Sequence, residues 1–156
     1  MNGDFTCTGR VARMPSDLFL KSMNVVHKTM LTLSFGKLGW KAAGMPVLKL
    51  TTTGRKSGEA RTVMLTSPVQ VGDTIVIVAS KGGEDKHPAW YLNLLAKPEV
   101  QVEWKGGAAK TMTASVASAA EKAELWPKIV AAFDRYGGYQ KRTDRDIPIV
   151  FLKDKK

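Results

Sequence analysis

The feature that most restricts the fold of this chain is a series of short strand-like segments, most of them joined by tight turns. Within the segments, apolar residues alternate with polar ones or form short β-branched runs, and glycine, proline or aspartate follows closely. Two strands joined by so short a turn must pair antiparallel. The segments cover residues 46–54, 60–71, 74–80, 98–104, 110–116 and 146–153.

We therefore predict a mainly β fold in which about six antiparallel strands, flanked by a few helices, form a small barrel. Six antiparallel strands with few helices most naturally close in this way, because closure removes exposed strand edges. Residues 74–78 read Thr-Ile-Val-Ile-Val, and this continuous run predicts a buried strand. Pro148 cannot donate a ladder hydrogen bond, so we expect it at a sheet edge or at the start of the last strand.

Residues 1–44 are predicted to form a helical extension in front of the barrel domain, which we assign to residues 45–156. Pro15 and Ser16 suit a first helical turn, and apolar residues then recur at helical spacing. Lysines and arginines accompany this segment. It is either a helix packed on the domain with solvated lysines, or a basic amphipathic helix that meets anionic lipid or lines the entrance for an apolar substrate.

Two further helices are expected within the barrel domain. Pro88 can occupy the first turn of one of them. Ser118 and Glu121 have the spacing of a capping box and predict the start of the other. Pro127 should kink or divide this last helix, because proline lacks a backbone N–H. The glycine pair 137–138 should then end it.

The charge and the scarcity of cysteine and histidine exclude several kinds of site. The net charge of +10 favours an anionic partner such as nucleic acid, a phosphorylated cofactor or an anionic membrane surface. Cys7 is the only cysteine, and His27 and His87 are the only histidines, so we expect no disulfide and no metal site. Nucleotide-binding glycine motifs are absent. Nucleic-acid binding is not expected, because Trp104 with Lys105 is the best basic aromatic patch and is thin.

The first polar cluster lies at the turn between the first two strand segments. Arg55 and Lys56 leave one strand as Arg61 enters the next, so their charged groups can converge. Arginine offers a bidentate fork and lysine a mobile point charge, which together suit phosphate. The alternative is that Glu59 pairs with one cation and water solvates the others. From the charges alone, both interpretations stay open.

The second polar cluster follows the buried strand. Ser80 and Lys81 precede the glycine pair 82–83, and a helix then begins. Backbone N–H groups, a lysine and a helix N-terminus together form an anion site in many phosphate-binding loops. Trp90 and Tyr91 offer flat surfaces for an aromatic ring. The alternative is an ordinary loop beside core aromatics, but two cationic turns near aromatic residues favour one ligand with both phosphate and ring.

A third cluster contains three aromatic residues at intervals of three. Phe133, Tyr136 and Tyr139 lie around a helix end and two glycines. Core packing explains Phe133. Tyrosines beside glycines suit a pocket wall, where a hydroxyl can meet a substrate.

These clusters also resemble a known family. The strings LTTTGRKSGEARTV, VIVASKGGEDKHPAWYLNLLAKPEVQV, YGGYQ and TDRDIPIV are similar to those of the deazaflavin-dependent nitroreductase and quinone reductase family of mycobacteria and related actinobacteria. The resemblance covers roughly Pro46 to Val150. It implies coenzyme F-420, an 8-hydroxy-5-deazaflavin, as cofactor, and a flavin-reductase-like split β-barrel as fold.

The resemblance also implies a set of site residues. Lys56 and Arg61 would hold the phosphate and the polyglutamate tail of the cofactor. The implied cofactor-binding residues are Arg55, Lys56, Arg61, Met64, Leu65, Val78, Ala79, Ser80, Lys81, Gly82, Gly83, Ala89, Trp90, Tyr91 and Asn93. Phe133, Tyr136 and Tyr139 would form the substrate pocket, with Ser80, Tyr136 and Tyr139 as catalytic residues. Phe133 replaces a tyrosine of the nitroimidazole-reducing member, so the resemblance does not extend to that hydroxyl.

The activity implied by the resemblance is hydride transfer from reduced coenzyme F-420 to a quinone, an enone or a related small-molecule acceptor. Two alternatives stay open: a split-barrel reductase that uses FMN, and a deazaflavin carrier without turnover. The N-terminus has no apolar core typical of a secretory signal, so we expect a cytoplasmic protein. Its basic first helix can contact the inner face of the membrane. The sequence leaves the oligomeric state open.

Overall fold

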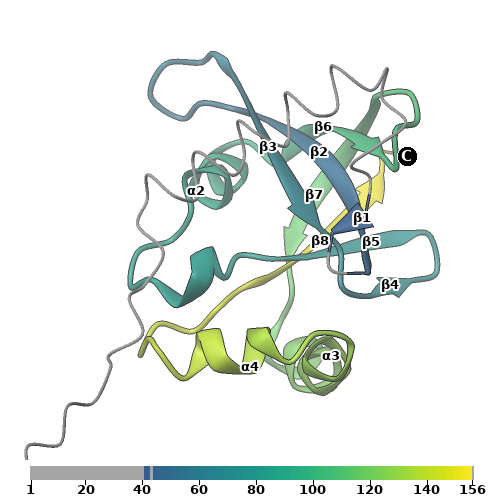
Figure 1. Cartoon of the computed structure of the whole chain (residues 1–156). Helices are drawn as coiled ribbons and strands as arrows, with labels where there is room; N and C mark the ends of the chain where they lie inside the picture. The colour runs from purple at the N-terminus through teal and green to yellow at the C-terminus, as the bar shows by residue number, and fades with distance from the viewer. Residues whose placement is uncertain (1–40, 43, 156) are drawn as a thin grey trace, which may run out of the picture.

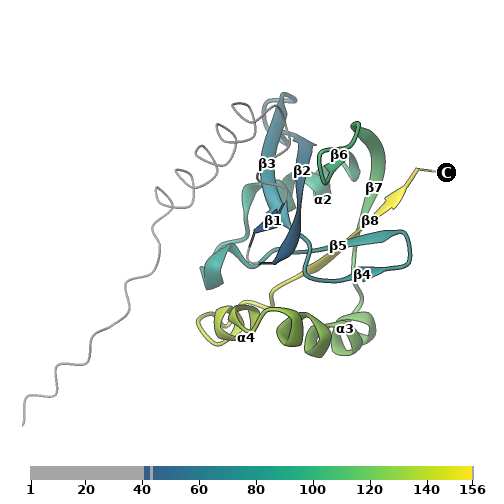
Figure 2. The same cartoon turned by 45° about the vertical axis from the view of Figure 1, so that its right-hand side comes forward.

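The structure, a computed structural model, describes residues 41–42 and 44–155. They form an antiparallel sheet that curls into an open half-barrel, with helices on both of its faces (Figures 1 and 2). The strands are β1 (Lys41–Ala42), β2 (Met45–Thr53), β3 (Ala60–Thr66), β4 (Gln70–Val71), β5 (Thr74–Val78), β6 (Glu99–Trp104), β7 (Lys110–Val116) and β8 (Ile149–Asp154). The helices are the 3-10 helix η1 (Lys81–Gly83) and the α-helices α2 (Ala89–Ala96), α3 (Ala119–Ala132) and α4 (Arg135–Gln140).

Every strand pairing in this sheet is antiparallel, as the short turns predicted. The strand order is β1-β2-β6-β7-β8-β5-β4, and β3 pairs with β2 over the whole length of β3. Of the strands described, β1 and β4 have only two residues each, which leaves six of five residues or more. The prediction of a mainly β split barrel with about six antiparallel strands and flanking helices is confirmed.

Two apolar cores, one on each face of the sheet, hold the half-barrel together. Along β5, Ile75 and Ile77 belong to the core that includes α2, whereas Val76 and Val78 belong to the core shared with α3 and α4. Successive strand residues face opposite sides, so this arrangement explains why the run is apolar without interruption. Burial of each such side chain contributes about 1.5–3 kcal/mol to folding.

The segment 60–71 is not one strand, and here the sequence prediction was wrong. β3 ends at Thr66 and β4 begins at Gln70, and the chain bends between them at Pro68. The Ser67 side chain is buried, and its Oγ lies 3.0 Å from the carbonyl oxygen of Val69 and 2.7 Å from that of Val76. Its single hydroxyl proton ties this segment to β5, and Pro68, which has no backbone N–H to donate, cannot continue the ladder, so the strand ends here.

The C-terminal helical region is also divided at a different place from the one predicted. α3 continues through Pro127, and the extended residue Phe133 separates it from α4, which contains the glycine pair 137–138. Proline removes the hydrogen bond to the carbonyl of Ala123, but that residue is exposed, so water can replace the bond. The first glycine serves helix packing, because a Cβ there would lie 3.3 Å from Cγ1 of Val130 on α3.

Other local predictions are confirmed. Ser118 Oγ accepts a hydrogen bond from the Glu121 backbone N–H, and a Glu121 carboxylate oxygen accepts one from the Ser118 N–H, so the capping box is complete. α2 begins directly after Pro88, and Pro148 directly precedes β8.

The predicted N-terminal helix lies outside the described residues, and the division at residue 44 stays a prediction. β1 lies within the segment assigned to the extension, yet it pairs with β2 around Gly44. No helix within residues 41–42 and 44–155 is long and apolar enough to cross a membrane.

Candidate active site

The turn between β2 and β3 brings the first group of predicted cations to one end of a large cleft. Hydrogen bonds of 2.7 Å from Gly54 N to the Glu59 carbonyl and from Gly58 N to the Gly54 carbonyl close this turn. Gly58 has a φ of 71°, a left-handed conformation that glycine adopts without strain. Arg55, Lys56 and Arg61 all line the cleft.

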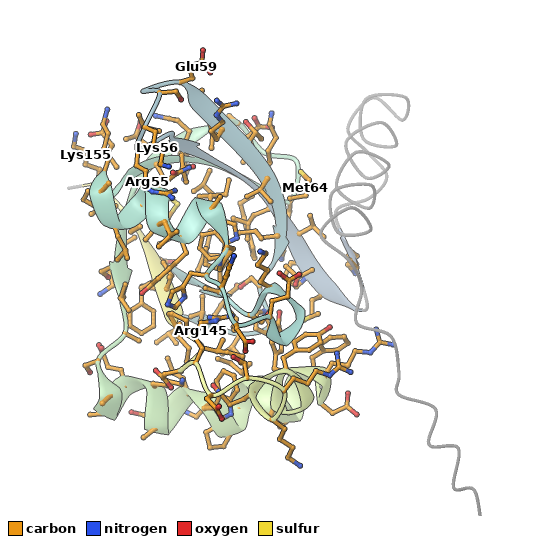
Figure 3. The ribbon with its side chains drawn as sticks, turned by 90° about the vertical axis from the view of Figure 1, so that its left-hand side faces the viewer. Arg55, Lys56, Glu59, Met64, Arg145 and Lys155 are labelled. Carbon is orange, nitrogen blue, oxygen red and sulfur yellow. The ribbon has the colours of Figure 1, made fainter. Side chains whose placement is uncertain are left out.

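Asn93 fastens this hairpin to α2. The amide is 4% exposed, and its Oδ1 accepts hydrogen bonds from the backbone N and from Nη1 of Arg55 at 3.2 and 3.4 Å. Its Nδ2 donates to Thr52 Oγ1 at 3.2 Å. Figure 3 shows Arg55 and Lys56 close together beside α2. The buried amide therefore sets the position of the hairpin cations relative to the helix.

Arg61 forms an ion pair that a ligand can replace. Its Nη2 lies 2.9 Å from Oε2 of Glu59, and the two side chains are 59% and 69% exposed. An exposed pair contributes at most about 1 kcal/mol, so an anionic ligand can displace Glu59 at little cost. Glu59 lies at the hairpin tip, far from Met64 on β3 (Figure 3). Glu59 thus pairs with one cation, as one interpretation predicted, and Arg61 also lines the cleft, where an anion site stays a prediction.

The β5–α2 loop has an unusual backbone. Lys81, Gly82 and Gly83 have φ values of 47°, 68° and 82°. A left-handed conformation costs a non-glycine residue about 1–2 kcal/mol, so Lys81 is strained. Its Nζ pairs with Oε2 of Glu84 at 2.9 Å. Gly83 is required by packing, because a Cβ there would lie 2.6 Å from the carbonyl oxygen of Tyr139 on α4.

The aromatic cluster forms one wall of the cleft. Tyr136 is 5% exposed, and its hydroxyl lies 3.3 Å from Thr66 Oγ1 at the end of β3. Its ring meets Phe133 and Tyr139 edge-on, with centroids 5.6 and 5.9 Å away. Burial raises the pKa of Tyr136 above its ordinary value of 10, and the hydrogen bond with Thr66 offsets only part of this rise. The hydroxyl therefore keeps its proton at neutral pH.

Arg145 is a residue that sequence reasoning did not select. Its Nη1 and Nη2 donate to the carbonyl oxygens of Ala79 and Ser80 at 3.2 and 3.0 Å. Nη1 also lies 3.1 Å from Nδ1 of His87, whose pKa is lowered by burial and by the charge of Arg145. A single arginine before a strand has no sequence pattern that indicates a role in a binding site. Only its place in the TDRDIPIV string could have drawn attention to it.

The three clusters surround a cleft of about 860 Å³, a volume within the usual range for small-molecule sites. The predicted site residues that line it are Arg55, Lys56, Arg61, Met64, Leu65, Val78, Ser80, Lys81, Gly82, Ala89, Trp90, Asn93, Phe133, Tyr136 and Tyr139. Ala79, Gly83 and Tyr91 are buried and do not line it. The lining residues that were not predicted are Ala42, Val47, Gly54, Ser57, Thr62, Val63, Thr66 and Pro88.

The cleft is chemically divided along β3. Arg61, near the hairpin turn, and Thr66, beside the tyrosines, lie five positions apart on β3, or about 17 Å at ~3.3 Å per residue. Met64 and Leu65 lie between them on β3, and Trp90 of α2 adds a further apolar surface to the cleft. This set of groups fits a flat, largely apolar ring with an anionic tail at the cationic end. The fold and the cleft thus define a split-barrel protein with a cleft suited to a planar, acidic cofactor.

Comparison with known proteins identifies the family. The profile described as "F420H(2)-dependent quinone reductase" matches residues 24–154, and the chain belongs to this family. A protein of that name from Mycobacterium tuberculosis H37Rv is 40% identical over 121 residues, which cover 75% of this chain and 80% of the relative.

Two solved structures are similar to this chain. An F420-H2 dependent reductase, FDR-A, has a TM-score of 0.60 and 38% identity, and the match covers 69% of this chain and 94% of that one. A structure described as a domain-swapped dimer has a TM-score of 0.63 and 36% identity over 83% and 96% of the two chains.

Proposed function

We propose that this chain transfers hydride from reduced coenzyme F-420 to a quinone or to another conjugated acceptor such as an enone. The observation that carries the proposal is one cleft that combines a cationic hairpin, an apolar middle and a buried tyrosine hydroxyl. Family membership supports the cofactor, and the names of the relatives support a quinone as acceptor.

The cationic half of the cleft is proposed to bind the cofactor. Lys56 and Arg61 would hold the phosphate and the acidic tail, and the ring would rest between Met64, Leu65 and Trp90. When bound, reduced coenzyme F-420 supplies a hydride, because a deazaflavin has carbon where a flavin has its reactive nitrogen. The chain itself must bind the cofactor, orient it and exclude water.

The aromatic half of the cleft is proposed to bind the acceptor. Reduction of a quinone consumes one hydride and one proton, and Tyr136 can donate or position that proton because its hydroxyl is buried and protonated. Tyr139 would orient the ring of Tyr136, and the Ser80 hydroxyl would hydrogen-bond the acceptor. Phe133 offers no hydroxyl, so we expect quinones to be reduced faster than nitroimidazoles.

Steady-state oxidation of reduced coenzyme F-420 with menadione tests the proposal, and titrations with coenzyme F-420 and FMN accompany it. Turnover together with saturable binding of coenzyme F-420 supports it. Binding of FMN without binding of the deazaflavin would establish the FMN reductase instead. Binding of the deazaflavin without turnover on quinones, enones or nitroaromatics would establish a carrier.

We also propose a cytoplasmic location, with contact between the N-terminal segment and the anionic inner face of the membrane. This rests on the sequence, because that segment lies outside the described residues. Deleting the residues before Lys41 leaves β1 and the cleft residue Ala42 in place, so it should reduce sedimentation with anionic vesicles and preserve cofactor binding; equal sedimentation of both forms would contradict the contact. The domain-swapped relative supports a dimer, which light scattering on the full chain will test.

A further inference from the structure

Arg145 lies between α4 and β8, half-buried beside the β5–α2 loop (Figure 3). Its guanidinium contacts both ends of this loop. Nη1 and Nη2 donate to the carbonyls of Ala79 and Ser80 at 3.2 and 3.0 Å, and Nε donates to the carbonyl of Glu84 at 3.1 Å. Nη1 also lies 3.1 Å from Nδ1 of His87. One side chain therefore spans the loop that carries Ser80 and the left-handed turn.

We propose that Arg145 is a positioning residue that holds the β5–α2 loop in its cofactor-binding conformation. The carbonyls that it binds flank residues 81–83, all of which have positive φ. The two glycines adopt this conformation without strain, but Lys81 does not, and a strained residue persists only where the surrounding structure holds it. A planar guanidinium, with donors in a fixed fork, reaches several carbonyls at once, which a lysine ammonium does not.

The backbone around Arg145 is in turn fastened to the helix that carries the tyrosines. The Arg145 carbonyl accepts a hydrogen bond from Nε2 of Gln140, the last residue of α4, at 2.8 Å. The Arg145 N–H donates to Thr143 Oγ1 at 3.2 Å, and that hydroxyl donates to Asp85 Oδ1 at 2.8 Å. Arg145 thus joins the cofactor loop to α4, which presents Tyr136 to the acceptor half of the cleft.

The ligand-free protein gives the first test. In Arg145→Met, amide hydrogen exchange of residues 79–85 should accelerate at least about tenfold. The loop in this variant has no guanidinium hydrogen bonds to break, so its local opening costs less free energy. His87 gives a second signal, since Nδ1 faces the Arg145 donor and the ring proton must lie on Nε2. Nitrogen-15 NMR should show this tautomer in the wild type and a mixture of tautomers in the variant.

Cofactor binding gives the second test and rests on the proposed function. The dissociation constant for oxidised coenzyme F-420 should rise about tenfold in Arg145→Met, equivalent to about 1.4 kcal/mol. Arg145→Lys keeps the positive charge but lacks the planar guanidinium donors, so its affinity should exceed that of Arg145→Met only slightly. Lys128→Met removes an exposed cation of α3, paired with Glu124 outside the cleft, and should change neither loop exchange nor affinity.

Three outcomes would overturn the inference: wild-type loop exchange and affinity in Arg145→Met, full recovery in Arg145→Lys, or an equal loss in Lys128→Met. If thermal unfolding shows that Arg145→Met does not fold, the same measurements on Arg145→Lys decide. Loop exchange and cofactor affinity equal to those of the wild type in that variant overturn the inference. If the wild type binds no coenzyme F-420, the proposed function fails. The exchange and NMR measurements still decide the role of Arg145 in that case.

Discussion

Glu59 is predicted to compete with the acidic tail of the cofactor, so Glu59→Gln should strengthen cofactor binding. Oε2 of Glu59 lies 2.9 Å from Nη2 of Arg61, and both side chains are well exposed. A bound anion must take over this contact. An exposed ion pair is worth about 0.2–1 kcal/mol, so its removal should lower the dissociation constant between about 1.4-fold and fivefold.

Fluorescence titration with oxidised coenzyme F-420, at low and at high ionic strength, measures this change. The gain should shrink at high salt, because salt screens exposed charges over about 10 Å at 0.1 M. Glu124→Gln is the matched control, since Glu124 forms an exposed pair with Lys128 on α3 and does not line the cleft. An unchanged or raised dissociation constant in Glu59→Gln refutes the competition, and an equal gain in Glu124→Gln shows a general charge effect.

Four further predictions follow from the same geometry. Neutralising Lys56 and Arg61 together should raise the dissociation constant of coenzyme F-420 at least about tenfold, a loss of about 1.4 kcal/mol of binding free energy. Unchanged affinity would show that the hairpin is a solvated turn and not an anion site. Tyr136→Phe should lower kcat by about 100-fold, because general acid catalysis typically supplies this much, while cofactor affinity stays the same. A kcat close to that of the wild type would show that Tyr136 does not donate the proton. In Gly83→Ala, the added Cβ would lie 2.6 Å from a backbone oxygen, which should lower the free energy of unfolding by about 2 kcal/mol. For a chain of this length, that loss corresponds to a fall in Tm of about 4–8 °C. The pKa of His87 is lowered by burial and by Arg145, so the unfolded chain binds its proton more readily. The stability from neutral His87 is therefore present above pH 6.5 and is lost as pH falls below it, which urea unfolding across pH measures.

Two control variants sharpen these measurements. Gly138→Ala adds a Cβ that meets nothing within 4 Å, so it should leave Tm close to wild type. A similar fall in both glycine variants would mean that the contact at Gly83 is not the cause. His87→Gln cannot gain a charge, and it should flatten the fall in stability below pH 6.5. A pH dependence identical to wild type would assign the effect to other groups.

Features set by neighbouring residues could be predicted from the sequence. Ser118 and Glu121 lie three residues apart, so their capping box depends only on local backbone. The antiparallel pairing of β2 with β3 follows from a six-residue turn, 54–59, which leaves the chain no other direction. The cations of that hairpin are likewise placed by local geometry at one end of the cleft.

Features that depend on distant partners could not be predicted. The hydroxyl of Ser67 meets the carbonyl of Val76 on β5. α3 continues through Pro127 because Leu125 and Ile129 on either side of it are buried and the unpaired carbonyl of Ala123 is exposed to water. The hydroxyl of Tyr136 meets Thr66, seventy positions away in the sequence. No pattern of propensity or spacing contains these pairs.

By itself, the sequence determined the antiparallel strands, the helix cap and the residue types that can bind an acidic, planar cofactor. Only the tertiary structure decided which of them meet in one cleft and what holds them there. Arg145 is the clearest example, since its guanidinium binds carbonyls more than sixty residues earlier in the chain. Backbone carbonyls are the same at every residue, so no sequence pattern distinguishes those that an arginine will bind. Their selection comes from the curvature of the sheet and the packing of α4 against the loop.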